Sequence, residues 1–108
     1  MNSETKITSV EERSGNYIVR GIHGEIMRRS AVRGDILIGF SNNIIVVQRN
    51  QDLFTFTANF NQIARHSLAK EDVVRAVVGD NILVYRPIGN FLTTYDSNFR
   101  EIEKHTSY

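Results

Sequence analysis

The sequence predicts an all-β protein made of about three similar units, each with four short antiparallel strands except the first, which is incomplete. Two observations predict this class. The segment FNQIARHS at 60–67 returns as FREIEKHT at 99–106, 39 residues later, with Phe, Ile, a basic residue, His and a hydroxyl in the same order. Short apolar runs rich in Val and Ile also alternate with turn residues along the chain. A repeat of this length is typical of stacked repeat architectures.

A third, weaker copy supports the repeat. The segment GEIMRRS places Ile26 at the position of Ile63 and Ile102. From Ile26 to Arg49 is 23 residues, and from Ile63 to Arg86 is again 23 residues. We therefore expect a single domain over 1–108, with repeats at about 5–33, 34–70 and 71–108.

Turn signals divide each unit into short strands. In the last unit GDN, PIGN and DSN separate four apolar or Thr-rich runs. The middle unit gives four runs in the same order, and the first unit lacks the leading one. Because the aligned partners of 61–78 are rich in Gly and β-branched residues, that segment is read as two strands and not as a helix. The eleven expected strands are 6–12, 16–20, 24–30, 35–40, 43–49, 53–57, 61–67, 72–78, 81–86, 91–95 and 99–106.

The hydrophobic pattern predicts how these strands are buried. ILIGF, IIVV, VVRAVV and ILVY are continuous apolar runs, which are typical of strands covered on both faces. The third strands mix Thr with aromatic residues, and the fourth strands are polar, as expected of an outer edge. Tyr17 aligns with Leu53 and Phe91 as a core position. If Ile63 and Ile102 are equivalent, Asp at either position is expected to damage folding to a similar extent.

The four-stranded unit of about 40 residues, with TTYDSNFREIEKHT across its third and fourth strands, resembles the β-propeller blade repeat. The resemblance is one of pattern and covers nearly the whole chain. It identifies no subfamily, because the Trp-Asp dipeptide and the kelch-type double glycine are absent. It implies a propeller-like stack of sheets and carries over no active-site residue. A single β-sandwich or β-barrel is the alternative fold.

Fewer than three full units would leave an apolar face or a strand edge open, whereas propellers close with about four to eight blades. Covering roughly 600 Å² of apolar surface contributes on the order of 15 kcal/mol before association costs. We therefore expect a homo-oligomer, with a dimer of about six blades favoured. The partner's chain could also supply the strand that the first unit lacks.

Composition excludes several classes of function. The net charge is +1 and the chain has no Cys, which removes disulfides and thiolate metal sites. No run of 18 apolar residues and no secretory signal is present, so a cytoplasmic location and no membrane partner are expected. A nucleic-acid partner is not expected at this charge. No cofactor is expected, and no metal, because the spacing of the three histidines matches no metal site.

Six basic residues form the one candidate binding site. They recur at the ends of the second strands and within the fourth strands, where a ring of repeats would gather them on one basic face: Arg13, Arg49, Arg86, Arg28, Arg65 and Lys104. Such a face would attract an acidic protein surface or a small anionic ligand. In the competing interpretation these side chains cover apolar strand ends and pair with neighbouring carboxylates.

The expected function is therefore a non-enzymatic binding or interaction module. Two alternatives remain open. One is a carbohydrate-binding, lectin-like propeller, and the other is an enzyme whose site forms only across the oligomer. No Gly-x-Ser-x-Gly elbow, Walker loop or dinucleotide fingerprint occurs in the sequence.

Overall fold

The computed structural model describes residues 6–106, and this part of the chain contains eleven strands and no helix. The all-β prediction is confirmed, and each predicted strand is found. The strands are β1 Ser9–Arg13, β2 Asn16–Gly21, β3 Gly24–Ser30, β4 Asp35–Phe40, β5 Ile45–Arg49, β6 Asp52–Phe56, β7 Gln62–Ser67, β8 Val73–Val78, β9 Asn81–Arg86, β10 Phe91–Tyr95 and β11 Glu101–Thr106.

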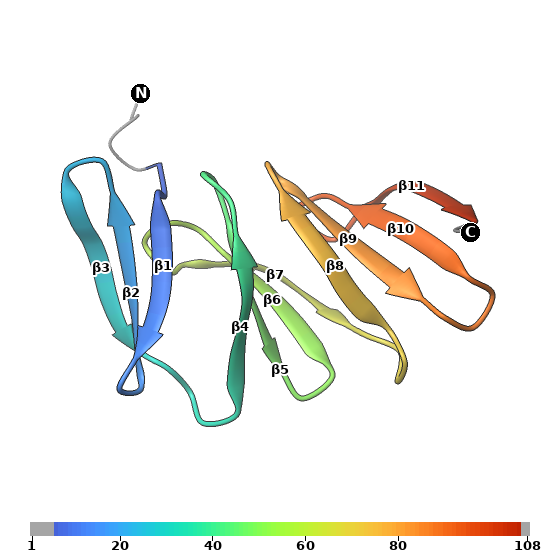
Figure 1. Ribbon diagram of the computed structural model, residues 1–108, viewed down its shortest axis with the longest axis horizontal. Coiled ribbons are helices and arrows are strands. Elements are labelled where there is room, and N and C mark those ends of the chain that lie inside the picture. Colours follow the sequence, from blue (N-terminus) through green and yellow to red (C-terminus); the bar gives the residue numbers. More distant parts are fainter. Residues whose placement is uncertain (1–5, 107–108) are drawn as a thin grey trace.

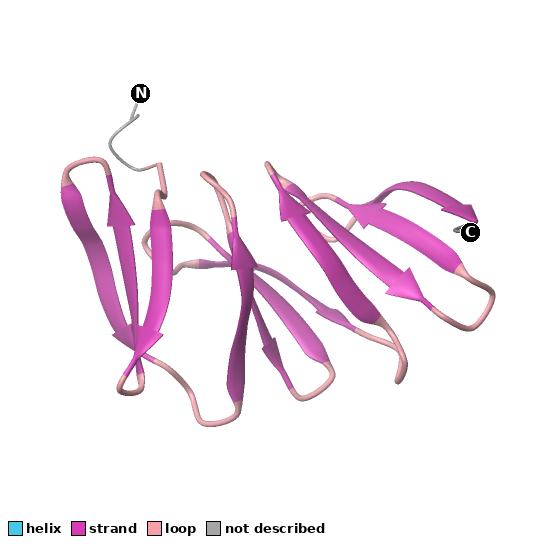
Figure 2. Ribbon diagram, viewed as in Figure 1, coloured by secondary structure: helices cyan, strands magenta, loops and turns pink. Residues whose placement is uncertain are grey.

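The strands form three separate antiparallel sheets, which follow one another in chain order (Figures 1 and 2). Sheet A has the order β1-β2-β3, sheet B the order β4-β5-β6-β7, and sheet C the order β8-β9-β10-β11. Sheets B and C each begin with a leading strand, β4 or β8, which sheet A lacks within the described residues. The sheets fan out from the side on which β4 and β8 lie (Figure 1). This arrangement is neither the closed barrel nor the two-sheet sandwich of the alternative prediction.

Backbone irregularities show that the three sheets are copies of one design. Each last strand carries a β-bulge opposite the same step of its neighbour, and the bulged residues are Ile26, Ile63 and Ile102. The preceding turns of sheets B and C also match, because Phe60 and Phe99 both adopt a φ of 61°. A left-handed backbone is uncommon for a bulky residue and requires support from its surroundings. The repeat read from the sequence is therefore a repeat of backbone geometry.

The forward face of a sheet is defined here as the face turned towards the next sheet along the chain, and the backward face as the opposite one. A first core lies between the forward face of sheet A and the backward face of sheet B. It is built around Tyr17 and Val19 from sheet A and Val47, Phe54 and Phe60 from sheet B, all of which are buried. A strand presents alternate residues to opposite sides, so the remaining residues of β5 are available to the other neighbour.

A second core joins the forward face of sheet B to the backward face of sheet C. Ile44, Val46 and Leu53 of sheet B pack with Ile82 and Val84 of sheet C. Sheet B is therefore covered on both faces. This confirms the prediction that the IIVV run at 44–47 is buried on both sides, since all four residues are at most 2% exposed.

The same prediction is wrong for the leading strands. Ile36 of β4 is 59% exposed, and Val73 and Val78 of β8 are 50% and 61% exposed. In the part of the chain that the structure describes, a leading strand has no strand beyond it and no sheet follows sheet C. These apolar side chains therefore have fewer neighbours than the sequence pattern implied.

The alignment of Tyr17 and Leu53 with Phe91 is also wrong by one residue. Leu53 lies opposite Gln48 and His66, and the residue with the matching place in sheet C is Leu92, opposite Tyr85 and His105. The turn 87–90 between β9 and β10 is longer than the turn 50–51 between β5 and β6, and this difference shifts the register.

Substitution by Asp is expected to destabilise the fold at Ile63 but not at Ile102. Ile63 packs against the second core, whereas Ile102 is 55% exposed on the forward face of sheet C. We expect Ile63→Asp to lower the free energy of unfolding by about 3 kcal/mol and Ile102→Asp by less than about 0.5 kcal/mol. Urea denaturation at low protein concentration measures both. Equal losses would contradict the assignment of the two faces.

Candidate functional site

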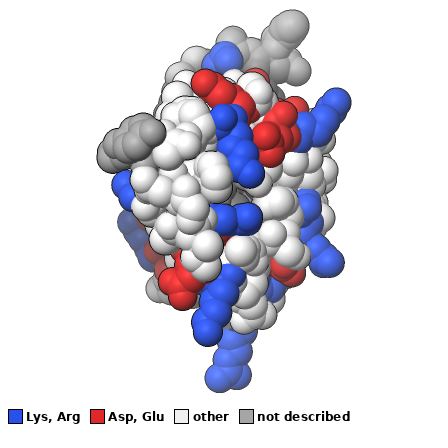
Figure 3. All heavy atoms as spheres, turned by 90° about the vertical axis from the view of Figure 1, so that its right-hand side faces the viewer, with Lys and Arg blue, Asp and Glu red and all other residues white. Residues whose placement is uncertain are grey.

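The forward face of sheet C is the first candidate surface. It presents Leu83, Leu92, Thr94 and Ile102, which are partly exposed or exposed. Their counterparts in sheet B are Val46, Leu53, Thr55 and Ile63, of which the first three are 0% exposed because sheet C covers them. No other described sheet covers the forward face of sheet C. The end of the molecule formed by sheet C shows a broad uncharged area between charged side chains (Figure 3).

Two polar contacts connect a covered forward face to the sheet that covers it. The Thr55 hydroxyl donates a hydrogen bond to the carbonyl of Ser97 in sheet C, at 2.8 Å. Arg29 of sheet A donates from Nη1 to the carbonyl of Phe60 in sheet B, at 2.7 Å. Both contacts reach the turn before the last strand of the next sheet. Thr94, the counterpart of Thr55, occupies the same register position in sheet C.

The same turns deliver an aromatic ring to the previous sheet. The ring of Phe60 stacks on Tyr17 with a centroid distance of 5.1 Å, and that of Phe99 stacks on His66 at 5.2 Å, both at an interplanar angle of 19°. Burial in this stack lowers the pKa of His66. His105 has the strand position of His66 but is 52% exposed, and its Nδ1 lies 3.7 Å from Glu103. The two histidines share a register and differ in their surroundings.

The six predicted basic residues all lie on backward faces, as one pair in each sheet. In every sheet one cation lies on the last strand, directly opposite a residue of the strand before it. The other cation is the Arg at the end of β1, β5 or β9, and it lies on the same face of the sheet. The pairs flank Ile18 in sheet A, Phe54 in sheet B and Thr93 in sheet C; they are Arg13 with Arg28, Arg49 with Arg65, and Arg86 with Lys104.

In sheets B and C the second-strand Arg is bound to an Asp at the start of the leading strand. Arg49 Nε donates to Asp35 Oδ1 at 2.6 Å, and Arg86 Nε donates to Asp72 Oδ1 at 2.9 Å. Each Asp also accepts a backbone N–H three residues before it, at 3.1 Å for Asp35 and 3.0 Å for Asp72. We call this arrangement the Asp–Arg clasp. It holds the leading strand to the sheet.

Ionisation of these aspartates is favoured by the clasp. For Asp35, burial opposes the charge but is outweighed by hydrogen bonds from Arg49, the N–H of Val32 and the Tyr17 hydroxyl, so that its pKa is lowered. For Asp72, the hydrogen bond from Arg86 outweighs burial and also lowers the pKa. Burial and the neighbouring Asp35 carboxylate raise the pKa of the Tyr17 hydroxyl far above its ordinary value. These arginines therefore have a structural role.

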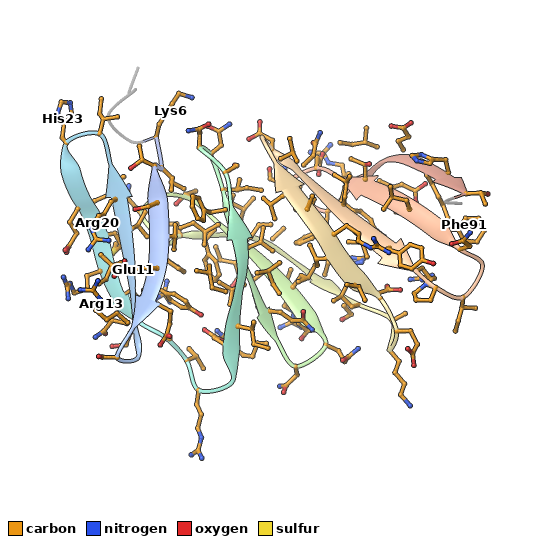
Figure 4. All side chains as sticks on the ribbon, in the orientation of Figure 1. Lys6, Glu11, Arg13, Arg20, His23 and Phe91 are labelled. Carbon is orange, nitrogen blue, oxygen red and sulfur yellow. The ribbon has the colours of Figure 1, made fainter. Side chains whose placement is uncertain are left out.

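Sheet A has no clasp within residues 6–106, and its backward face carries a surface charge network instead. Arg13 Nη2 lies 2.7 Å from Glu11, and Arg20 Nη1 lies 3.2 Å from the same carboxylate. Arg28 is bound to Glu25 at 2.9 Å. Glu11, Arg13 and Arg20 lie together over sheet A (Figure 4). Four of the six predicted cations thus contact carboxylates, as the structural interpretation of these residues requires.

The cation pair of sheet C borders a hollow, which is the second candidate site. In sheet B the ring of Phe54 lies 4.8 Å from the Arg49 guanidinium and 6.0 Å from that of Arg65. Sheet C has the smaller Thr93 at the matching position, and a pocket of about 160 Å³ remains. Its lining includes Asp72, Arg86, Phe91, Tyr95, Glu101 and Lys104.

The pocket combines charge with aromatic surface. Lys104 Nζ lies 4.7 Å from the centroid of the Phe91 ring. With Arg86 already bound to Asp72, Lys104 is the cation best placed to meet a small polar or anionic molecule, and Glu101 and Tyr95 supply further hydrogen-bonding groups. Within residues 6–106, no group of three His, Asp or Glu side chains is arranged to hold a metal ion. The described chain also has no helix that could cross a membrane.

No model of a known protein family matches this chain, and neither does any curated protein sequence.

The Asp–Arg clasp and the pocket were not among the features predicted from the sequence. The clasp had a signal, since Asp35 and Asp72 each precede their Arg partner by 14 residues (49 − 35 and 86 − 72). The pocket arises because sheet C has Thr93 at the position where sheet B has Phe54. The two residues correspond only when the greater length of the turn 87–90 is allowed for.

Acid should weaken the fold through the clasps. Because the pKa of Asp35 and Asp72 is lower in the folded chain than the value of about 3.9 in an unfolded one, both groups stabilise the fold above that pH and lose this effect below it. We expect the urea midpoint to fall between about pH 5 and pH 2. The double variant Asp35→Asn/Asp72→Asn should start lower and change less over this range. An unchanged slope would contradict the assigned role of the clasps.

Filling the pocket tests the equivalence of Thr93 and Phe54. We expect Thr93→Phe to place a ring between Arg86 and Lys104 and to raise the free energy of unfolding by about 1 kcal/mol, as cavity filling commonly does. Thr94→Phe is the matched control, because its side chain lies on the opposite face and leaves the pocket empty. A loss of stability in Thr93→Phe alone would show that the pocket is not the place of the Phe54 ring.

Proposed function

We propose that this protein is a non-enzymatic interaction module that works by stacking its sheets on those of a partner, in the manner of β-propeller blades. The observation that carries the proposal is the exposed forward face of sheet C. Its Leu83, Leu92 and Ile102 repeat a surface that is covered twice within the chain, on sheets A and B. An exposed apolar face of this kind is typical of an interaction site.

A second copy of the chain is the proposed partner, and a dimer would contain six sheets. This number lies within the range of about four to eight blades in closed propellers. Stacking head to tail would place the forward face of sheet C against the backward face of sheet A. The latter carries Ile18, which is 1% exposed, surrounded by the Glu11, Arg13 and Arg20 network. Glu103 on sheet C supplies a carboxylate opposite these arginines.

Association should depend on the forward face of sheet C. We expect the wild-type chain to form dimers in light scattering coupled to chromatography and Ile102→Asp to weaken the dimer at least 100-fold, because a carboxylate would be buried without a partner. Ile36→Asp is the matched control, since Ile36 is equally exposed on β4 outside this face. A wild-type monomer at all concentrations, or equal effects of both variants, would contradict the proposal.

Carbohydrate binding is a second candidate function, supported by the pocket of sheet C. The rings of Phe91 and Tyr95 and the carboxylate of Glu101 provide the mixture of apolar face and hydrogen-bonding groups that suits a sugar. Lys104 at the same pocket suits a small anion instead. A glycan array and a phosphate resin distinguish these ligands. Thr93→Phe is expected to abolish either interaction by filling the pocket, and retention of binding would exclude this site.

A further inference from the structure

Sheet A lacks a leading strand within the described residues, and its strand β1 therefore lies at the edge of the sheet. The corresponding strands β5 and β9 are each paired on both sides. An edge strand presents unpaired backbone N–H and C=O groups, onto which an extended segment of another polypeptide can add. The side of β1 nearest to β4 is where such a strand would lie (Figure 1).

The sequences of the two leading strands indicate which residues are preferred in a strand at this position. β4 begins with the Asp of a clasp and β8 directly follows one, and two apolar residues come next in both, as DILIGF at 35–40 and DVVRAV at 72–77. Both have a β-bulge in the middle, followed by the small residue Gly39 or Ala76. At Gly39 a Cβ atom would come within 3.3 Å of Val77, which explains the preference for a small residue. The shared pattern is Asp, apolar, apolar, any residue, small, apolar.

Sheet A retains the half of the clasp that receives this pattern. Arg13 ends β1 as Arg49 and Arg86 end β5 and β9, and its side chain is 67% exposed. Arg13 can turn to a new carboxylate without leaving Glu11 unpaired, because Arg20 also contacts Glu11, at 3.2 Å.

The charges of β1 refine the pattern. Glu12 takes the place of Gln48, which lies opposite the second residue of the leading strand, whereas Glu11, opposite the third residue, stays paired with Arg20. Opposite charges in directly facing positions stabilise an antiparallel pair. A segment that fits β1 therefore has Asp first and a basic residue second.

We propose that the free edge of β1 is a docking site for an extended segment of a different polypeptide, which begins with Asp followed by a basic residue and binds antiparallel to β1, with its Asp held by Arg13. A second copy of this chain does not supply the segment, since β4 and β8 are already paired in their own sheets and no third stretch of the sequence has the pattern.

The test measures binding of a fluorescent peptide containing Asp-Lys-Val-Arg-Ala-Val to the full chain, by fluorescence polarisation. A scrambled peptide of the same composition is the control. We expect the peptide with Asn in place of Asp to bind about tenfold more weakly, and Arg13→Gln to remove that difference. Ile102→Asp, which is expected to be monomeric, should show the same preference for the Asp peptide over the Asn peptide, so failure of the assembly proposal would leave this preference unchanged.

Exchange of the charges adds a second readout. Arg13→Glu should prefer the peptide with Lys in place of its first Asp, and amide hydrogen exchange in β1 should slow when the preferred peptide is bound. Equal binding of the Asp, Asn and scrambled peptides, or no binding at millimolar peptide, would overturn the proposal.

Discussion

Coverage of both faces of sheet B by its two neighbours is the interaction on which the rest of the structure depends. The residues Ile44–Val47 point alternately to the two cores, and none of them is more than 2% exposed. A four-stranded sheet of this size has no core of its own, so its apolar residues are buried only by adjacent sheets. The two end sheets each have one such neighbour within the chain. The outer face of sheet A is charged, whereas the outer face of sheet C is apolar, so the two ends of the molecule differ in chemistry.

One backbone design supports three different local outcomes. The same cation pair flanks Ile18, Phe54 or Thr93, and the result is a charged surface, a filled core or a pocket. The clasps of sheets B and C are alike in their atoms, yet sheet A keeps only Arg13. Each of the surfaces proposed as binding sites therefore lies where a copy departs from the others. Such departures are tolerated because the neighbouring sheets hold the backbone in place.

The repeat, the strands and the absence of a helix from the described residues could be predicted because they depend on local sequence. Short apolar runs, turn residues and the similar segments around Ile26, Ile63 and Ile102 are all local signals in the sequence. Burial could not be predicted in the same way, because Ile63 and Ile102 have the same sequence context and different neighbours. The candidate basic residues recur at one type of position, but their carboxylate partners differ. Arg13 and Arg28 are bound by a Glu of their own strand, whereas Arg49 and Arg86 are bound by an Asp 14 residues earlier in the chain. The pocket depends on one side-chain exchange after a loop of different length.

The central claim is that sheet C ends in a face built to receive another copy of the same sheet. The most direct test is to lengthen the chain by repeating residues 68–106 after its last residue and to measure urea unfolding and amide exchange. In a linear array each added unit contributes its own stability and that of one interface. If the face receives a further sheet, we expect a higher urea midpoint and slower amide exchange in β9 and β10 of the original sheet C. An unchanged midpoint and unchanged exchange would contradict it.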